Sequence, residues 1–406
     1  MGVARSSDSG SSDGVFRRQV LYIPGYDPFP PRRYRELYRK EGAEQAAISG
    51  YELALHPRPG AGYGWKVTSR IAGQTTEADV EVLVWSDLVK GSMARGIAGT
   101  YAQLARTGWL YLRTGALRRL VRLRKGPMLA ALYPAAGLIL QGLVALGIGA
   151  LVLWAAAGLP GGLGWLAAAA AVWAVLAGFR RIDHRLYVHY LMHDYAFATA
   201  RDGAYPAVLD ARLAAFRDRV RAAFAPGVDE VLVVGHSSGV QLAVTVLADL
   251  IRQGLPESRA ALGFLSLGQA VPMVSFLPGA GRLRGDLAYL SQRKELTWVD
   301  VSAPGDGCSF ALCDPVAVSG LATPGQRWPL VLSAAFSQTL SPARWEALRR
   351  RYFRLHFQYL CAFDRPGTYD YFQITAGPLT LAKRFRGRRP SAGRIATPLS
   401  PFRDVA

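Results

Sequence analysis

The chain has few cysteines and few acidic residues for its length. Three cysteines among 406 residues, Cys308, Cys313 and Cys361, match no metal-ligand spacing, which favours a reducing compartment. Lys and Arg number 48 against 29 Asp and Glu, and the formal charge of +19 indicates an anionic partner, either nucleic acid or a phospholipid surface. Residues 1–14 lack the apolar run of a secretion signal, and we expect residues 1–18 to form a disordered tail.

Two stretches contain no charged residue at all. Residues 132–157 form the first and residues 163–179 the second, joined by a turn at 158–162. About 20 such residues suffice to cross a bilayer as a helix. The sequence therefore predicts a transmembrane hairpin over residues 126–182, with a re-entrant hairpin or two buried core helices as the alternatives.

Basic residues flank this hairpin on both sides, whereas the turn between the two stretches is uncharged. They are Arg122, Arg124 and Lys125 before it and Arg180, Arg181 and Arg185 after it. The positive-inside rule places both ends in the cytoplasm. Residues 101–125 have the pattern of a basic amphipathic helix at a membrane surface, and residues 383–406 that of a disordered basic tail. Because these clusters adjoin the hairpin, we favour anionic lipid over nucleic acid as the partner.

A Gly-x-Ser-x-Gly motif is centred on Ser237. It follows an apolar, β-branched run at 231–234 and precedes a segment of helical pattern at 240–252. A sharp turn between strand and helix lifts a serine hydroxyl above the sheet edge, and Gly235 and Gly239 remove the Cβ atoms that would collide there. The helix beginning at Ser238 directs N–H groups at the same place, which suits a developing oxyanion. An ordinary Gly-rich turn is the alternative.

This strand, turn and helix resemble the nucleophile elbow of the α/β-hydrolase superfamily. The resemblance covers about residues 20–86 and 230–356 and implies an α/β fold with a mostly parallel sheet flanked by helices. The hairpin would be an insertion between two parts of one domain, residues 19–125 and 183–382. The resemblance also implies an oxyanion hole of the N–H groups of Gly25, Tyr26 and Ser238, and a catalytic acid and then a histidine after Ser237.

Two carboxylates compete for the role of the acid. Asp306 lies just beyond a predicted strand at 295–302, and Asp314 lies in an Asp-Pro-Val sequence; we favour Asp306, although either side chain could cap a turn. His356 is the only histidine after Ser237. A predicted helix at 344–353 separates it from the predicted strand at 330–336, so a buried packing histidine remains the alternative.

The remaining motifs indicate neither a metal nor a cofactor. His189 and His193 share a helix face at i and i+4, but no third ligand accompanies them. No P-loop or dinucleotide fingerprint occurs. We therefore expect a membrane-anchored serine hydrolase that cleaves an ester or thioester, with a lipid as the hypothesis for its substrate. The alternative is a catalytically silent scaffold with a hydrolase fold.

The pattern along the chain also predicts the other elements. Further strands are expected at 19–23, 51–56, 65–71, 80–85 and 261–267, and further helices at 32–48, 183–199 and 206–224.

Overall fold

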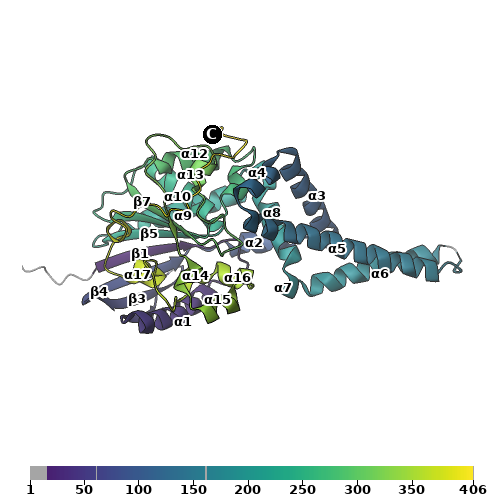
Figure 1. Cartoon of the computed structure of the whole chain (residues 1–406), viewed down its shortest axis with the longest axis horizontal. Coiled ribbons are helices and arrows are strands. Elements are labelled where there is room, and N and C mark those ends of the chain that lie inside the picture. Colours follow the sequence, from purple (N-terminus) through teal and green to yellow (C-terminus); the bar gives the residue numbers. More distant parts are fainter. Residues whose placement is uncertain (1–15, 61, 161, 406) are drawn as a thin grey trace, which may run out of the picture.

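One eight-stranded sheet forms the centre of the molecule (Figure 1). The computed structural model describes residues 16–60, 62–160 and 162–405. The strands follow one another across the sheet in the order β2-β3-β4-β1-β5-β6-β7-β8. Their bounds are β1 Phe16–Ile23, β2 Glu52–Pro57, β3 Tyr63–Ile71, β4 Gln74–Val82, β5 Glu230–His236, β6 Ala261–Leu267, β7 Leu296–Ser302 and β8 Leu330–Ser333.

The sheet is mostly parallel, as the sequence predicts. From β4 through β1 and on to β8 every neighbouring pair is parallel, while β3 is antiparallel to both β2 and β4. Short connections permit only antiparallel pairing, and longer crossovers permit parallel pairing. Strand β4 begins six residues before the predicted strand at 80–85. Ala72 and Gly73 adopt positive φ and form a tight turn, so the polar residues that follow them pair directly with β3.

Helices cover both faces of the sheet and form the hairpin. Their bounds are α1 Arg32–Ser49, α2 Ser86–Met93, α3 Ile97–Arg113, α4 Ala116–Leu123, α5 Lys125–Ala155, α6 Leu163–Arg181, α7 Asp183–Leu186, α8 Val188–Ala198, η1 Ala200–Gly203, α9 Ala207–Ala222, α10 Gly239–Arg252, α11 Pro272–Ser275, α12 Gly281–Ser291, α13 Pro315–Val318, α14 Phe336–Thr339, α15 Pro342–Leu348, α16 Tyr352–His356, η2 Gln358–Leu360, α17 Tyr371–Ala376 and α18 Leu381–Arg384.

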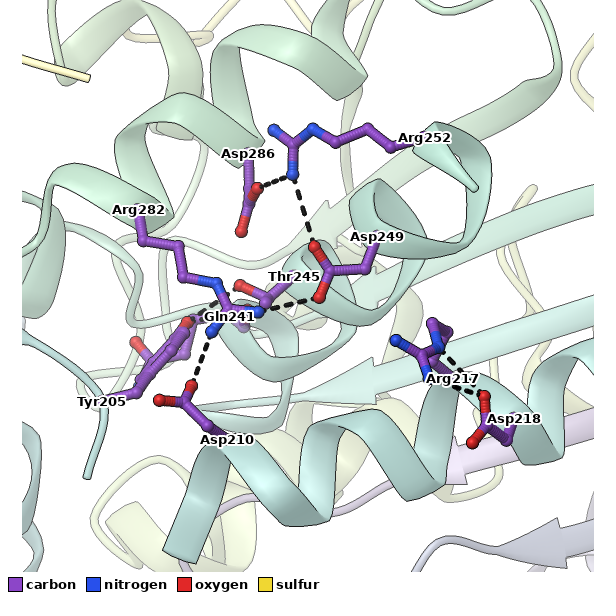
Figure 2. A network of polar contacts seen from close by, with 10 residues as sticks. All are labelled: Tyr205, Asp210, Arg217, Asp218, Gln241, Thr245, Asp249, Arg252, Arg282 and Asp286. Carbon is purple, nitrogen blue, oxygen red and sulfur yellow. Dashed lines mark hydrogen bonds and ion pairs between the residues drawn. The ribbon is translucent and has the colours of Figure 1, made fainter. Parts of the chain in front are cut away.

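The alternation of side chains along β1 divides the core between the two faces. Leu21 and Ile23 pack with α9, α10 and α12, and Val20 and Tyr22 pack with α1 and α17. On the first face a polar network holds the three helices together: Figure 2 shows Arg282 of α12 between Asp210 of α9 and Asp249 of α10, at 2.6 and 2.8 Å. Arg252 of α10 likewise contacts Asp286 of α12 at 2.5 Å.

Helices α5 and α6 pair with each other and project from the rest of the molecule (Figure 1). Both are long and apolar enough to cross a membrane. At 1.5 Å per residue, the 31 residues of α5 span about 46 Å and the 19 of α6 about 28 Å. Large apolar side chains such as those of Leu146 and Trp154 are 62 % and 80 % exposed on the hairpin.

The basic helix expected at 101–125 is instead two helices, α3 and α4. Gly115 adopts a φ of 66° and breaks the helix there, and the chain then turns into α5 at Lys125. The two helices pack against α5 and, through α3, against α8. Trp109 and Leu112 are exposed on α3.

The basic C-terminal segment is ordered against the body, so the prediction of a disordered tail at 383–406 is wrong for residues 383–405. The amide of Ser391 donates to Val331 of β8 at 3.0 Å, and Ile395 forms a β-bridge with Cys313. The composition of the segment does not reveal these contacts, because they join backbone groups and the side chain of Arg394 to residues distant in the sequence. At the other end, residues 1–15 of the predicted tail lie outside the described residues, but Arg18 is buried in β1 and pairs with Glu230 at 2.6 Å.

Candidate functional site

Three of the predicted site residues lie where the strand order of the sheet reverses direction. Strand β1 lies between β4 and β5, and the chain continues toward one edge of the sheet from β1 and toward the other from β5. In open α/β sheets, ligands bind at the carboxyl ends of the strands where the strand order reverses in this way. Gly25 and Tyr26 follow β1, and Ser237 follows β5.

Ser237 occupies a strained turn between β5 and α10. Its φ is 57°, a left-handed conformation that costs free energy in a residue other than glycine. Its amide is held by a 2.9 Å hydrogen bond to the carbonyl of Leu267. A Cβ built on Gly239 would lie 2.3 Å from the carbonyl oxygen of Ile23, and one on Gly235 would lie 2.9 Å from the Cα of Val240. Both glycines of the motif are therefore required by packing, as the sequence predicts.

The loop after β1 lies directly beside this turn. A Cβ on Gly25 would be 3.0 Å from the Cβ of Ser237. The amide of Tyr26 donates to the hydroxyl of Ser238 at 2.8 Å, so this predicted oxyanion donor is already engaged. Within the described residues, the amides of Gly25 and Ser238 have no hydrogen-bond partner.

His356 and Asp306 form a buried pair. His356 is the last residue of α16, and its Nδ1 lies 2.8 Å from Oδ2 of Asp306 in the loop after β7. The same carboxylate accepts from the hydroxyl of Tyr359 at 2.9 Å and from the amide of Cys308 at 2.9 Å. Burial favours the neutral acid, but His356 and these donors outweigh it and hold the pKa of Asp306 below its ordinary value.

Asp314, the competing carboxylate, lies elsewhere. It caps α13 by accepting from the amides of Val316 and Ala317, and its other oxygen pairs with Arg394 at 2.5 Å. Both of its oxygens thus have structural partners. Asp306 is the carboxylate that contacts the histidine.

The ring of His356 lies beside the turn that carries Ser237. Its ring centroid lies 4.7 Å from that of His236, whose Nε2–H donates to the carbonyl of His356 at 3.0 Å. A Cβ on Gly268, the residue after Leu267, would lie 3.2 Å from Cε1 of His356. Nε2 of His356 is buried and has no hydrogen-bond partner among the described residues. Burial, followed by the charge of His356, lowers the pKa of His236 to about 3, which keeps that ring neutral.

Helix α8, which follows the hairpin, forms another wall of the site. Tyr190 donates through its hydroxyl to the carbonyl of Tyr26, and Phe197 packs on the Tyr26 ring at 5.7 Å between centroids. Burial raises the pKa of Asp194, on the same helix, to about 7, and the charge of His356 opposes this rise. The site therefore has a carboxyl group in addition to that of Asp306, and the charge of this second group changes near neutral pH.

Among the residues that the structure describes, metal-ligating side chains lie close together in two places. Donor atoms of Asp306, Cys308 and His356 lie within 4.8 Å of one another, but two of these atoms are those of the Asp306–His356 hydrogen bond. Burial raises the pKa of Cys308 well above its ordinary value, which disfavours the thiolate that binds metals. His193 of the second pair contacts Gln103 at 2.8 Å, and burial lowers its pKa to about 4.

Sequence reasoning overlooked three residues at this site: Tyr359, Cys308 and Asp194. Tyr359 follows His356 by three residues, a spacing at which two side chains can meet on a helix. This spacing is the one feature of the sequence that indicates Tyr359 as a residue of the site. Comparison of the chain with family models, with curated proteins and with solved structures finds no match.

Proposed function

We propose that the protein is a membrane-anchored serine hydrolase that cleaves a carboxylic ester or thioester through an acyl-enzyme. One observation carries this proposal above all others. The buried Asp306–His356 pair leaves Nε2 of the imidazole without a partner, and the ring packs beside the strained turn of Ser237. A nucleophile, a base and a group that orients the base are the parts that such chemistry requires.

In the proposed reaction, Ser237 Oγ attacks the acyl carbon while its proton passes to Nε2 of His356. The negative charge that develops on the carbonyl oxygen is stabilised by the amides of Gly25 and Ser238 and by the positive end of α10. The intermediate collapses, and the leaving alcohol or thiol departs with the proton from His356. Water then attacks the acyl group on Ser237, again with His356 as base, which releases the carboxylic acid and restores the hydroxyl.

Asp306 stays ionised throughout this cycle, because its pKa is held low. Its carboxylate keeps the proton of the neutral imidazole on Nδ1, which leaves Nε2 free to accept. It also stabilises the imidazolium that forms transiently.

The position of the hairpin supports the proposal that the substrate reaches the site from the membrane. Helix α5 begins beside the loop of the acid, since a Cβ on Gly126 would lie 3.7 Å from the Cα of Gly307. We infer that α5 and α6 span the bilayer with both ends in the cytoplasm, and that the site faces the inner leaflet. An acyl lipid, an ester or a thioester, is the substrate class that this position favours.

The membrane part of the proposal is tested by placing one charge on the hairpin. Replacing the exposed Leu146 with Arg costs about 2.5–3.5 kcal/mol at the centre of a bilayer, so carbonate is expected to extract a larger share of L146R protein than of the wild type. Val208 of α9 is similarly exposed, at 58 % against 62 %, and V208R protein is expected to stay in the membrane fraction. Equal extraction of both variants would contradict a spanning hairpin.

The chemistry is tested with a fluorophosphonate probe on the full-length protein. We expect labelling of the wild type that is lost in Ser237→Ala and strongly reduced in His356→Gln, but unchanged in Ser258→Ala, a variant at an exposed serine. A chelator is expected to leave labelling unchanged; loss of labelling on its addition would favour a metal at Asp306, Cys308 and His356 instead.

The second candidate function is a catalytically inactive membrane scaffold. The observation that favours it is the hydrogen bond from the Tyr26 amide to Ser238, which occupies one of the three expected oxyanion donors. A folded protein that the probe never labels would support this candidate over the hydrolase.

A further inference from the structure

A cavity lies at the edge of the sheet opposite the candidate site. Its volume is about 620 Å³, within the range of small-molecule sites, about 300–1,000 Å³. It opens beside Thr297 and Leu330, at the amino ends of β7 and β8. Strand β7 rises about 3.3 Å per residue, so its five residue steps from Thr297 to Ser302 span roughly 16 Å. The cavity is therefore separated by about this length of strand from the carboxyl end of β7, where the loop that carries Asp306 begins.

Four arginines line this cavity: Arg327, Arg386, Arg388 and Arg394. Arg394 is neutralised by Asp314, and Arg388 contacts Thr368 at 3.3 Å. Among the described residues that line the cavity, none is acidic. The lining therefore keeps an excess of positive charge that the protein itself does not compensate.

Arg327 and Arg386 are the two cations available to a ligand. Within the described part of the chain, their guanidinium groups make no hydrogen bond or ion pair, whereas the backbones that carry them are fixed. The amide of Arg327 donates to Ser291 at 2.8 Å, and that of Arg386 to Lys383 at 3.4 Å. Planar guanidinium groups bind phosphoryl oxygens through paired hydrogen bonds, so unpaired arginines on a fixed backbone suit a phosphate.

The cavity lining also has an apolar part. It includes Trp328, whose indole N–H is held by the carbonyl of Arg293 at 2.9 Å, and the buried ring of Phe385. The hydrogen bond fixes the indole plane, which gives a flat surface on which a planar ligand group can stack. Inorganic phosphate alone would leave this apolar part unused.

We propose that this cavity binds a soluble, phosphorylated small molecule, with its phosphoryl group on Arg327 and Arg386 and its organic part against Trp328. The hairpin begins near the opposite, carboxyl edge of the sheet, which favours a soluble source over a headgroup of the same membrane. This inference is independent of the chemistry at Ser237.

The test is calorimetric titration of the full-length protein in detergent with pyrophosphate and with ATP. We expect both to bind, ATP more tightly than pyrophosphate because adenine adds stacking, and at least a tenfold loss of affinity in the double variant R327Q/R386Q. The matched control is R350Q/R351Q, which removes the same charge from two exposed arginines outside the cavity; its affinity should stay within twofold of the wild type. All four side chains are exposed, so unchanged melting temperatures confirm that the variants are folded.

Two results would overturn the proposal: no binding of either probe at millimolar concentration, or an equal loss in both double variants, which would indicate general charge attraction. Repeating the titration in nanodiscs distinguishes the source of the phosphate. Equal pyrophosphate affinity in phosphatidylcholine and phosphatidylserine discs is expected. Competition by phosphatidylserine that disappears in R327Q/R386Q would instead assign the cavity to a lipid headgroup.

Discussion

The Asp306→Asn variant tests the role of the carboxylate that orients His356, the base of the candidate triad. The carboxylate of Asp306 accepts three hydrogen bonds, from His356, Tyr359 and the amide of Cys308, at 2.8, 2.9 and 2.9 Å. An asparagine in the same place has one acceptor oxygen, and its NH₂ group cannot accept from Nδ1–H. If the NH₂ group faces Nδ1, the imidazole keeps its proton on Nε2 and cannot accept one from Ser237.

We expect kcat to fall about 10⁴-fold, the scale of the corresponding change in a serine protease triad, or about 5.5 kcal/mol of transition-state stabilisation. Loss of the charge-assisted hydrogen bonds should cost about 1.5–3 kcal/mol of stability. Hydrolysis of a p-nitrophenyl ester by the purified protein gives kcat, and urea denaturation gives the free energy of unfolding.

Asp314→Asn is the matched control. This side chain is also buried and also has an ionic partner, Arg394, but it does not contact the histidine. The variant should lose stability and keep its kcat. The reasoning is refuted if folded Asp306→Asn protein retains more than a tenth of the wild-type kcat, or if the two variants lose activity equally.

Three further predictions concern pH and packing. Because Asp194 ionises near pH 7 and its charge then favours the imidazolium, Asp194→Asn should lower kcat/KM about tenfold above pH 8 and leave it unchanged below pH 6, in a pH profile of ester hydrolysis. Burial also raises the pKa of Asp300 to about 7, so the contribution of this carboxyl group to stability should fall as pH rises from about 4 through about 7. Asp300→Asn removes that loss, and urea titration at pH 8 should find the variant more stable than the wild type by as much as about 4 kcal/mol. A stability difference between the two proteins that stays the same from pH 4 to pH 8 would contradict the burial argument. Gly239→Ala should destabilise the fold by about 3 kcal/mol or more, because its Cβ would overlap the carbonyl of Ile23, whereas Gly108→Ala, which has open space around it, should not lower the melting temperature.

The parts of the site that could be predicted are those that depend on neighbouring residues. The elbow around Ser237 is a local pattern, because a strand, two glycines and a helix follow one another directly in the chain. His356 was found by its place after Ser237, as the last histidine of the chain. The helix predicted at 344–353 is in fact two short helices, and the second of them ends at His356 itself.

Other features depend on contacts between distant segments, which the sequence pattern does not contain. Whether Asp306 or Asp314 meets the histidine depends on which loop α16 packs against. Asp194 enters the site only because α8 folds back along α5 after the hairpin. The C-terminal segment has the composition of a disordered tail, but the amide of Ser391 bonds to Val331 of β8, and Ile395 exchanges backbone hydrogen bonds with Leu312 and Asp314.

The most direct test of the account is a burst experiment with a p-nitrophenyl ester, followed by mass spectrometry of the quenched protein. An acyl-enzyme mechanism predicts a rapid release of one p-nitrophenolate per chain, together with an acyl group on the peptide that contains Ser237. A folded protein that gives no burst, or one that carries the acyl group on any other residue, would contradict the claim that Ser237, His356 and Asp306 act together.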